Sequence, residues 1–226
     1  MNREDVKVSQ NVAAAIAHEL RNPVFGIASA AQLIRYRITD DPVMEKNIGR
    51  ILRETERLTA LISALLEYGR PAPVRLEPAD PDDIWTDVLE QHRGRLESRA
   101  LLVKYSRAEP RALCDIDAEQ FALACGNALA NAIEAAGEGT DLAIVSRLTS
   151  DGGWESQLSN QGALINPETL ARAFDPLMTT KSGHAGIGLA AARRIVSDHG
   201  GTVSLGSAKD TGTILTFTLP ASRVHA

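Results

Sequence analysis

The strongest constraint on the fold is a heptad pattern in the first third of the chain. Six side chains recur at intervals of three, four, three, four and three residues. They are Ile48, Ile51, Thr55, Leu58, Ile62 and Leu65. This spacing places them along one face of a helix, where they form a seam that another helix must cover.

A second helical stripe precedes this seam, with apolar residues spaced by three, four or seven positions. Its members are Val12, Ile16, Leu20, Ile27, Ala31, Ile34 and Ile38. The sequence TDDP at 39–42 is typical of a turn, so the pattern predicts two antiparallel helices. A hairpin about 35 Å long, at about 1.5 Å per residue, cannot bury both seams within itself. We expect a second copy to complete a four-helix bundle; the alternative is packing against the hairpin's own C-terminal domain.

A proline-rich stretch separates the hairpin from the rest of the chain. The segment GRPAPVRLEPADP at 69–81 holds four prolines and no apolar period, as linkers do. Beyond it, helical segments near 82–98, 117–136 and 189–200, and another after residue 166, alternate with strand-like runs. Those runs are LLVKYS, LAIVSRL, WESQLS, GTVSLGS and GTILTFTLP. We expect an α+β chain: a dimeric hairpin over 1–70, a linker over 71–80, and an α/β sandwich over 81–226.

Composition narrows the classes of function. The chain has 226 residues and a net charge of −5, and its scattered lysines and arginines predict no nucleic-acid or membrane surface. Cys114 and Cys125 lie among apolar neighbours, which favours reduced, buried thiols over a disulfide. We find neither a signal peptide nor an apolar run that could span a bilayer, so we expect a cytoplasmic chain. The helical pattern begins almost at Met1 without a capping signal, which is also compatible with a piece of a longer protein.

The segment HELRNP at 18–23 interrupts the first helix with a proline. His18 lies roughly opposite the apolar stripe, and Glu19 and Asn22 share its patch of helix surface. Pro23 cannot donate to the carbonyl of Glu19, so it bends the helix beside the imidazole. An imidazole with a carboxylate neighbour is a competent nucleophile. The segment predicts a phosphoryl or acyl acceptor; the alternative is an inert exposed histidine.

Two carboxamides recur at i and i+4 in the segment QFALACGNALANAIEAA, at Asn127 and Asn131. Asparagine is a poor choice for a helix interior. Amide oxygens are hard ligands that suit Mg²⁺, an ion that commonly bridges nucleotide phosphates. The pair therefore predicts a magnesium site, and the alternative is ordinary capping or packing.

A glycine-rich loop leads into the helix near 189–200. The segment FDPLMTTKSGHAGIGLAAARRIV directs backbone N–H groups and a positive helix end at one point, where a phosphate would bind. Lys181 adds a point charge there. Earlier, SNQGALINPE at 159–168 places Asn160 after a strand and Gly162 beyond it. Each segment could also be a simple turn.

In this order, the motifs resemble those of the catalytic core of sensor histidine kinases of two-component systems, over about residues 8–220. AHELRNP is similar to the phosphoacceptor box and NALANAIEA to the asparagine box. SNQGALI is similar to the first glycine box, FDPLMTTK to the phenylalanine box and GIGLAAARRIVSDHGG to the second glycine box, and GTILTFTLP to the closing strand. The order and spacing of six motifs are far more specific than any one of them.

The resemblance implies roles for individual residues. His18 would be phosphorylated, Glu19 would orient it, and Asn22 would position water for dephosphorylation of the partner. Asn127 and Asn131 would hold Mg²⁺ against the ATP phosphates. The other nucleotide-site residues implied are Asn160 at the adenine amine, Gly162, Thr179, Thr180, Lys181, Gly186, Gly188 and Thr213.

Three departures from the family pattern bear on ATP binding. Asn160 stands where the family has an aspartate, whose carboxylate is the stronger acceptor. Leu164 replaces a glycine in the same box. The resemblance implies that the glycine-rich loop before the helix near 189–200 is a mobile lid over the triphosphate, and there His184 and Ala185 replace a glycine and a threonine.

The resemblance implies autophosphorylation of His18 by ATP and transfer of the phosphoryl group to an aspartate of a response regulator's receiver domain. It also implies a homodimer through both helices, possible phosphatase activity, and an upstream sensor region if the chain is a fragment. The alternative is a non-catalytic phosphotransfer or docking module with a degenerate ATP-binding domain. A machine driven by ATP hydrolysis is disfavoured, since the amide of Asn127 cannot accept a proton as a base must.

Overall fold

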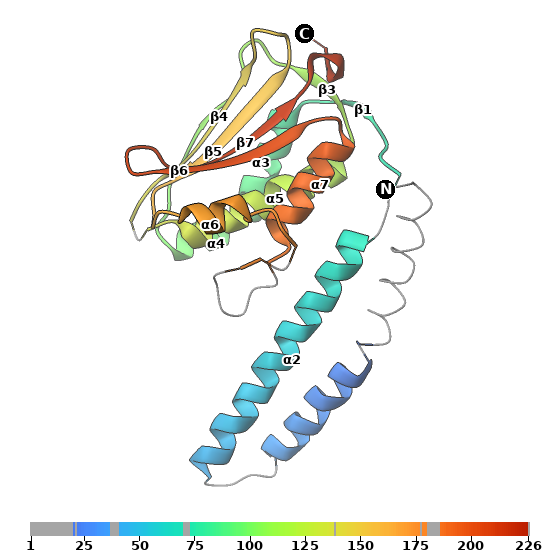
Figure 1. The fold of residues 1–226 in the computed structure, drawn as a ribbon, viewed down its shortest axis with the longest axis vertical. Coiled ribbons are helices and arrows are strands. Elements are labelled where there is room, and N and C mark those ends of the chain that lie inside the picture. The colour runs from blue at the N-terminus through green and yellow to red at the C-terminus, as the bar shows by residue number, and fades with distance from the viewer. Residues whose placement is uncertain are drawn as a thin grey trace. The chain divides into compact units, whose positions relative to one another are not determined.

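The computed structural model describes residues 20, 22–36, 41–69, 73–137, 139–176, 178–179 and 186–225. These residues fall into two compact units that divide between 72 and 73, with the segment 176–187 grouped with the first unit. Figure 1 shows the helices of the first unit and the sheet and helices of the second. The predicted order, a helical region followed by a mixed α/β region, is confirmed.

The first unit contains two helical stretches. Residues 22–36 are helical, and α2 extends over Pro42–Gly69. Asp41 caps α2, because its Oδ1 accepts hydrogen bonds from the N–H groups of Val43 and Met44 at 3.1 and 3.0 Å. Such a cap satisfies donors that every helix start leaves unpaired. Asp41, which caps α2, belongs to the turn predicted at 39–42.

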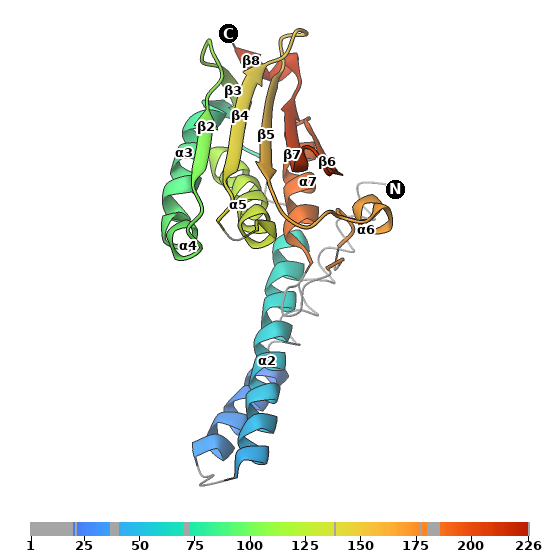
Figure 2. The same cartoon turned by 90° about the vertical axis from the view of Figure 1, so that its left-hand side faces the viewer.

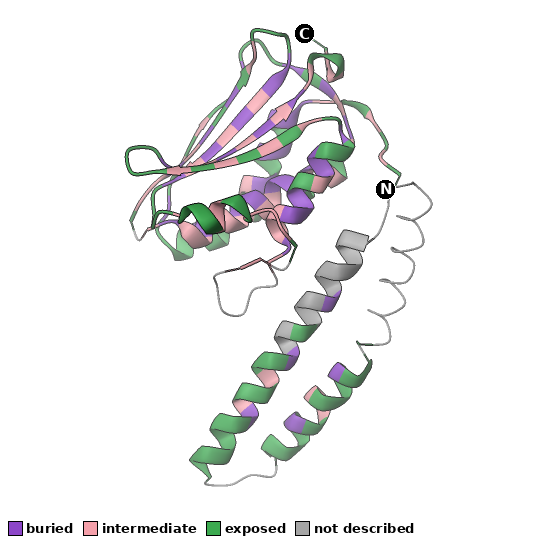
Figure 3. Ribbon diagram, viewed as in Figure 1, coloured by how far each residue is buried: buried purple, intermediate pink, exposed green. Residues whose placement is uncertain are grey.

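The predicted heptad seam is half buried within the chain. Ile48, Thr55 and Ile62, spaced by seven residues, are 3, 4 and 5% exposed. The intervening Ile51 and Leu58 are each 44% exposed, and Figure 3 shows this alternation along α2. The hairpin therefore leaves one row of the seam open.

The predicted stripe of the first helix is only partly correct. Ala31 is buried, but Ile27 and Ile34 are half exposed, and Val24, outside the predicted stripe, is buried instead. Leu20 is also exposed. The remaining predicted members, Val12, Ile16 and Ile38, lie outside the described residues.

A five-stranded sheet forms the second unit. Its strand order is β2-β4-β5-β7-β6, with β2 parallel to β4 and the other pairs antiparallel. The strands are β2 (Val103–Ser106), β4 (Leu142–Leu148), β5 (Trp154–Asn160), β6 (Thr202–Ala208) and β7 (Gly212–Leu219). These are the five predicted strands. A small sheet that was not predicted contains β1 (Glu77–Ala79), β3 (Leu113–Ile116) and β8 (Val224–His225), in the order β1-β3-β8.

Helices cover one face of this sheet. Figure 2 shows α3 (Pro81–Gln91), α5 (Ala118–Ala135) and α7 (Gly188–Asp198) on that face. Two short helices, α4 (Arg93–Ser98) and α6 (Pro167–Ala171), complete the unit with the 3-10 turn η1 (Ala221–Arg223). The single helix predicted near 82–98 is wrong, because the helical hydrogen bonding breaks at His92, between α3 and α4.

Aromatic side chains form the centre of the core between the sheet and the helices. Trp85, Phe121, Trp154 and Phe217 are fully buried. The rings of Trp85 and Phe217 stack with centroids 6.0 Å apart, and Phe121 meets Trp154 edge to face at 6.0 Å. Large rings at these distances dominate the energetics of a core, so they fix α3 and α5 on the sheet.

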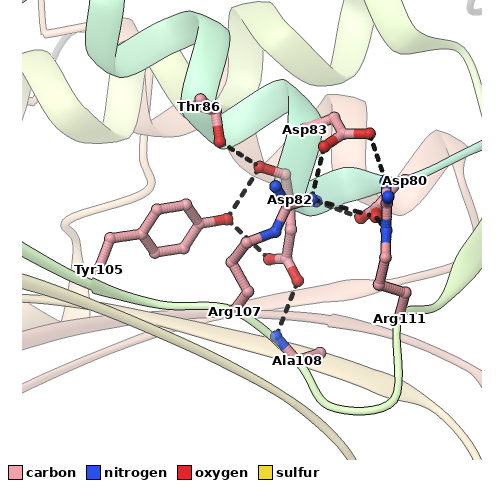
Figure 4. Close-up of polar contacts among 8 residues, drawn as sticks. All are labelled: Asp80, Asp82, Asp83, Thr86, Tyr105, Arg107, Ala108 and Arg111. Atoms are coloured by element: carbon pink, nitrogen blue, oxygen red, sulfur yellow. Dashed lines mark hydrogen bonds and ion pairs between the residues drawn. The ribbon is translucent and has the colours of Figure 1, made fainter.

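A buried carboxylate fixes the start of α3. Asp82 is 2% exposed, and its two oxygens accept hydrogen bonds from the Tyr105 hydroxyl and the Ala108 N–H, each at 2.9 Å. Figure 4 shows how these contacts join α3 to β2 and the loop that follows it. Burial, with the charge of Asp82 beside it, raises the pKa of Tyr105 well above its ordinary value, so the hydroxyl remains a donor.

Two arginines of the same loop bind the neighbouring carboxylates. Arg107 and Arg111 contact Asp80 at 3.2 and 2.8 Å, and both also pair with Asp83. The hydrogen bond from Arg107 holds the pKa of Asp83 below its ordinary value. Asp80 also caps α3 by accepting from the Asp82 N–H at 2.8 Å.

A buried histidine joins α5 and α7. His199 is fully buried, its Nδ1 lies 2.7 Å from the Ile195 carbonyl, and its Nε2 accepts from the Asp117 N–H at 2.9 Å. An imidazole that donates at one nitrogen and accepts at the other is neutral. The Asp117 carboxylate caps α5 through Gln120 and accepts from the Arg75 N–H at 3.0 Å. Part of the predicted linker over 71–80 is thus tied to the helix pair.

The turn after β5 passes unusually close to the end of α5. A β-bridge joins Gly162 to Ala136, and the Gly137 N–H donates to the Gln161 carbonyl at 2.7 Å. A Cβ at Gly162 would lie 2.1 Å from the Ala135 carbonyl oxygen. Only glycine lets the two backbones meet there, so this contact sets where the turn lies.

The prediction of two reduced cysteines is confirmed, since Cys114 and Cys125 are both buried and free. Burial raises the pKa of the Cys114 thiol to about 12 and that of Cys125 well above its ordinary value. Among the residues that the structure describes, no helix has the length and apolar character that a bilayer crossing requires.

We expect Asp82→Ala to lower the free energy of unfolding by about 2–4 kcal/mol. The substitution leaves the buried Ala108 N–H without its acceptor, and the Tyr105 hydroxyl keeps only the backbone carbonyl of residue 82. Urea denaturation measures the change. Asp87→Ala, at an exposed position of the same helix, is the control and should change stability by less than about 0.5 kcal/mol. Equal losses in the two variants would contradict the structural role of Asp82.

Gly162→Ala should destabilise the second unit by at least about 1–3 kcal/mol, because the added methyl overlaps the Ala135 carbonyl. Gly206→Ala on β6 is the matched control, since a Cβ there meets nothing within 4 Å. Thermal unfolding of both variants compares them. A neutral Gly162→Ala would mean that the turn does not need this close approach.

Candidate functional site

A polar site lies at the end of β5, on the face of the sheet that the helices cover. Asn160 is the last residue of β5 and is only 5% exposed. It follows Trp154, Ser156 and Leu158 on the buried face of the strand. In the sheet it stands opposite Leu142 of β4 and Thr213 of β7. The strand thus carries an amide into the layer between sheet and helices.

The Nδ2 atom of Asn160 is buried and has no hydrogen-bond partner. It faces the turn at Gly162, where an added Cβ would lie 3.4 Å from it. A buried donor without a partner is rare in folded proteins. Its presence beside a glycine turn indicates a place where a ligand can supply the missing acceptor.

Hydroxyl groups extend this polar patch across the next two strands. The buried Thr213 has its Oγ1 3.1 Å from the Oγ of Ser207 on β6. Ser207 also accepts a hydrogen bond from the Ile165 N–H at 3.1 Å, which ties the turn after β5 to the sheet. Sequence reasoning missed Ser207, although its place in the inward-facing alternation of β6 could have indicated it.

The second part of the site lies on α5, where Asn127 and Asn131 occupy one face. Both are partly exposed. Gly188, the first residue of α7, is a neighbour of Asn127: a Cβ there would lie 3.5 Å from the Asn127 Oδ1, an ordinary van der Waals distance. The carboxamide of Asn127 therefore lies beside a helix N-terminus, where the unpaired N–H groups of the first turn attract anions.

The remaining predicted residues are placed only in part. Asn22 is exposed, Thr179 is half buried, and Gly186 has a positive φ of 66°. Leu164, which replaces a glycine of the family pattern, is 55% exposed and so lies outside the core. The others lie outside the described residues: His18, Glu19, Thr180, Lys181, His184 and Ala185.

The two amides of α5 do not by themselves form a complete cation site. Within the described part of the chain, no group of three or more histidine, cysteine or acidic side chains could hold a metal ion. Two neutral amide oxygens are too few to hold a divalent cation alone, but they can complete the shell of Mg²⁺ that arrives on phosphates.

Comparisons with known families agree with this geometry. Residues 9–73 match the family described as His Kinase A (phospho-acceptor) domain. Residues 116–223 match the family described as Histidine kinase-, DNA gyrase B-, and HSP90-like ATPase. Together the two matches cover the acceptor segment, the asparagine pair and Asn160.

Individual relatives and a solved structure show the same likeness. The chain is 32% identical over 222 residues to the sensor histidine kinase ZraS of Klebsiella oxytoca, which covers 97% of this chain and 48% of ZraS. It is 29% identical over 224 residues to the sensory histidine kinase/phosphatase NtrB of Rhodobacter capsulatus, which covers 93% of this chain and 62% of NtrB. The structure of histidine kinase ThkA in complex with response regulator protein TrrA shares the fold, with a TM-score of 0.71 at 23% identity over 97% of this chain and 64% of that one.

The chain thus spans about half the length of the ZraS sequences that it matches. Its two family matches follow each other in the order that the motifs predicted, with the phosphoacceptor helices first and the ATPase domain second. The chain therefore belongs to the sensor histidine kinases of two-component systems and holds their catalytic core.

Proposed function

We propose that the chain phosphorylates itself on His18 with ATP and passes the phosphoryl group to an aspartate on the receiver domain of a response regulator. The main structural support for this proposal is the distance between two glycine contacts along α5. Gly162 lies against Ala135, and Gly188 lies next to Asn127. From Ala135 back to Asn127 the helix extends about 12 Å at about 1.5 Å per residue, a length that a nucleoside triphosphate spans.

In this arrangement the base lies at the Asn160 end and the phosphates at the Asn127 end. Thr213 and Gly162 belong to the base end. Asn127, Asn131 and Gly188 belong to the phosphate end. The family resemblance also assigns Thr179, Thr180, Lys181 and Gly186 to phosphate binding. When bound, Mg²⁺ would neutralise charge on the phosphates, and Asn127 and Asn131 would hold it there.

Phosphoryl transfer depends mainly on holding the reacting groups in position and neutralising their charge, rather than on covalent chemistry by the protein. The free ring nitrogen of His18 attacks the γ-phosphorus, the bond from that phosphorus to the bridging oxygen breaks, and ADP leaves. Glu19 holds the proton on the other ring nitrogen, which fixes the tautomer that attacks. The amides of Asn127 and Asn131 take no proton, which suits transfer to His18 rather than hydrolysis by activated water.

We assign residues 1–70 to the dimerisation and phosphoacceptor domain, 71–80 to a linker, and 81–226 to the catalytic ATP-binding domain. The half-exposed Ile51 and Leu58 support a homodimer, because a second hairpin would cover that open row of the seam. The free thiols of Cys114 and Cys125 suit a reducing compartment, and we place the reaction in the cytoplasm. A degenerate, non-binding domain is less well supported, since residues 116–223 match the ATPase family.

Dephosphorylation of the regulator is a second activity that we propose for the same helix. NtrB is named as a kinase and a phosphatase, and Asn22, which is exposed, follows His18 by four residues in the sequence. A carboxamide can accept from and donate to a water molecule, so Asn22 would hold the water that attacks the phosphorylated aspartate.

Incubation with Mg²⁺ and γ-labelled ATP should label the protein with an acid-labile, base-stable phosphate. His18→Gln should abolish the label, because no ring nitrogen remains to attack. His225→Gln, at an exposed histidine near the C-terminus, should leave it unchanged. Asn127→Ala should slow labelling by about 10²-fold or more through lost charge stabilisation. Label that persists in His18→Gln would refute the assignment.

Asn22→Ala should label at the wild-type rate yet dephosphorylate a phosphorylated regulator at least about tenfold more slowly, because only the water-positioning group is lost. Loss of label from purified phosphoregulator measures this step. Asn47→Ala, at an exposed position of α2, is the control. Equal dephosphorylation by the Asn22→Ala and wild-type proteins would remove the phosphatase role from Asn22.

A further inference from the structure

The unpaired donor of Asn160 is a feature of the site that the carboxylate of the family pattern would not share. Its Nδ2 is buried and without a partner in a side chain that is only 5% exposed. Its cross-strand neighbours, Leu142 and Thr213, carry no charge that could compensate. A donor kept in such a place costs free energy unless something binds to it.

An amide and a carboxylate present different patterns to a purine. A carboxylate only accepts hydrogen bonds, whereas an amide presents one donor group and one acceptor side by side. Half a turn about its last side-chain bond exchanges the two. The 6-aminopurine edge shows a donor, N6–H, beside the acceptor N1, and the 6-oxopurine edge shows the acceptor O6 beside the donor N1–H. At the 6-position itself, an amide can accept from N6–H or donate to O6, whereas a carboxylate can only accept from N6–H.

The hydroxyl groups next to Asn160 can also either donate or accept hydrogen bonds. Thr213 stands directly opposite on β7, and its hydroxyl lies 3.1 Å from that of Ser207. Either hydroxyl can donate in this pair, because each rotates to suit its neighbours. The polar groups at the base end can therefore follow whichever orientation the amide adopts.

We propose that Asn160 lets this site bind 6-oxopurine as well as 6-aminopurine nucleoside triphosphates, so that GTP competes with ATP. The proposal rests on the proposed function, because it takes the Asn160 end of the site to hold the base. It makes Asn160 the residue that determines base specificity, because a carboxylate facing the 6-position would accept from N6–H but repel O6.

Isothermal calorimetry of the full chain with Mg²⁺-ATP and Mg²⁺-GTP tests this. The two dissociation constants should agree within about tenfold for the wild type. Asn160→Asp should shift the ratio by about 10- to 100-fold in favour of ATP, because the carboxylate sets its lone pairs against O6 and offers no donor. Asn160→Leu, which removes both polar atoms, should weaken both nucleotides alike.

Gln91→Glu is the matched control, since it makes the same amide-to-acid change at an exposed position at the end of α3. It should leave the ratio unchanged. Thermal unfolding without nucleotide reports whether each variant is folded. If Asn160→Asp does not fold, the ratio of the ATP and GTP dissociation constants of the wild type still tests the proposal. Preference for ATP beyond about tenfold in the wild type overturns this proposal and leaves ATP binding intact. Binding of neither nucleotide overturns both.

Discussion

Close contact between the backbone after β5 and the last turn of α5 is the constraint on which the site depends. The Gly137 N–H donates to the Gln161 carbonyl at 2.7 Å, and Gly162 has no room for a side chain. Strand and helix are thereby held at one fixed separation at this end of the sheet. Because Asn160 immediately precedes the contact, its amide is held at the same place, below the turn and beside Thr213.

The opposite end of α5 is fixed by different chemistry. Asp117 caps the helix and accepts from the Arg75 N–H, while its own N–H donates to His199 at the end of α7. The two helices are therefore joined at the end remote from Gly188. Because one end of the helix pair is anchored, the end near Gly188 is where small rearrangements cost least.

Sequence periodicity was enough to predict the hairpin, the five strands of the main sheet and the order of the motifs, because each depends on local patterns. It failed where tertiary contacts decide. The strands β1, β3 and β8 have two to four residues each, too few for a pattern. The exposed Ile27 and the buried Val24 depend on the angle at which the helices meet, which the stripe alone does not contain. Ser207 and His199 matter through partners far along the chain.

The departure of Asn160 from the family pattern was visible in the sequence, but its consequence was not. From the sequence alone, an amide in place of a carboxylate reads as a weaker acceptor. The structure adds that the donor of this amide is buried and unpaired. A carboxylate at this position would repel a ligand carbonyl, whereas the amide can donate a hydrogen bond to it. A substitution that lowers the strength of one hydrogen bond can in this way widen the set of ligands that the site accepts.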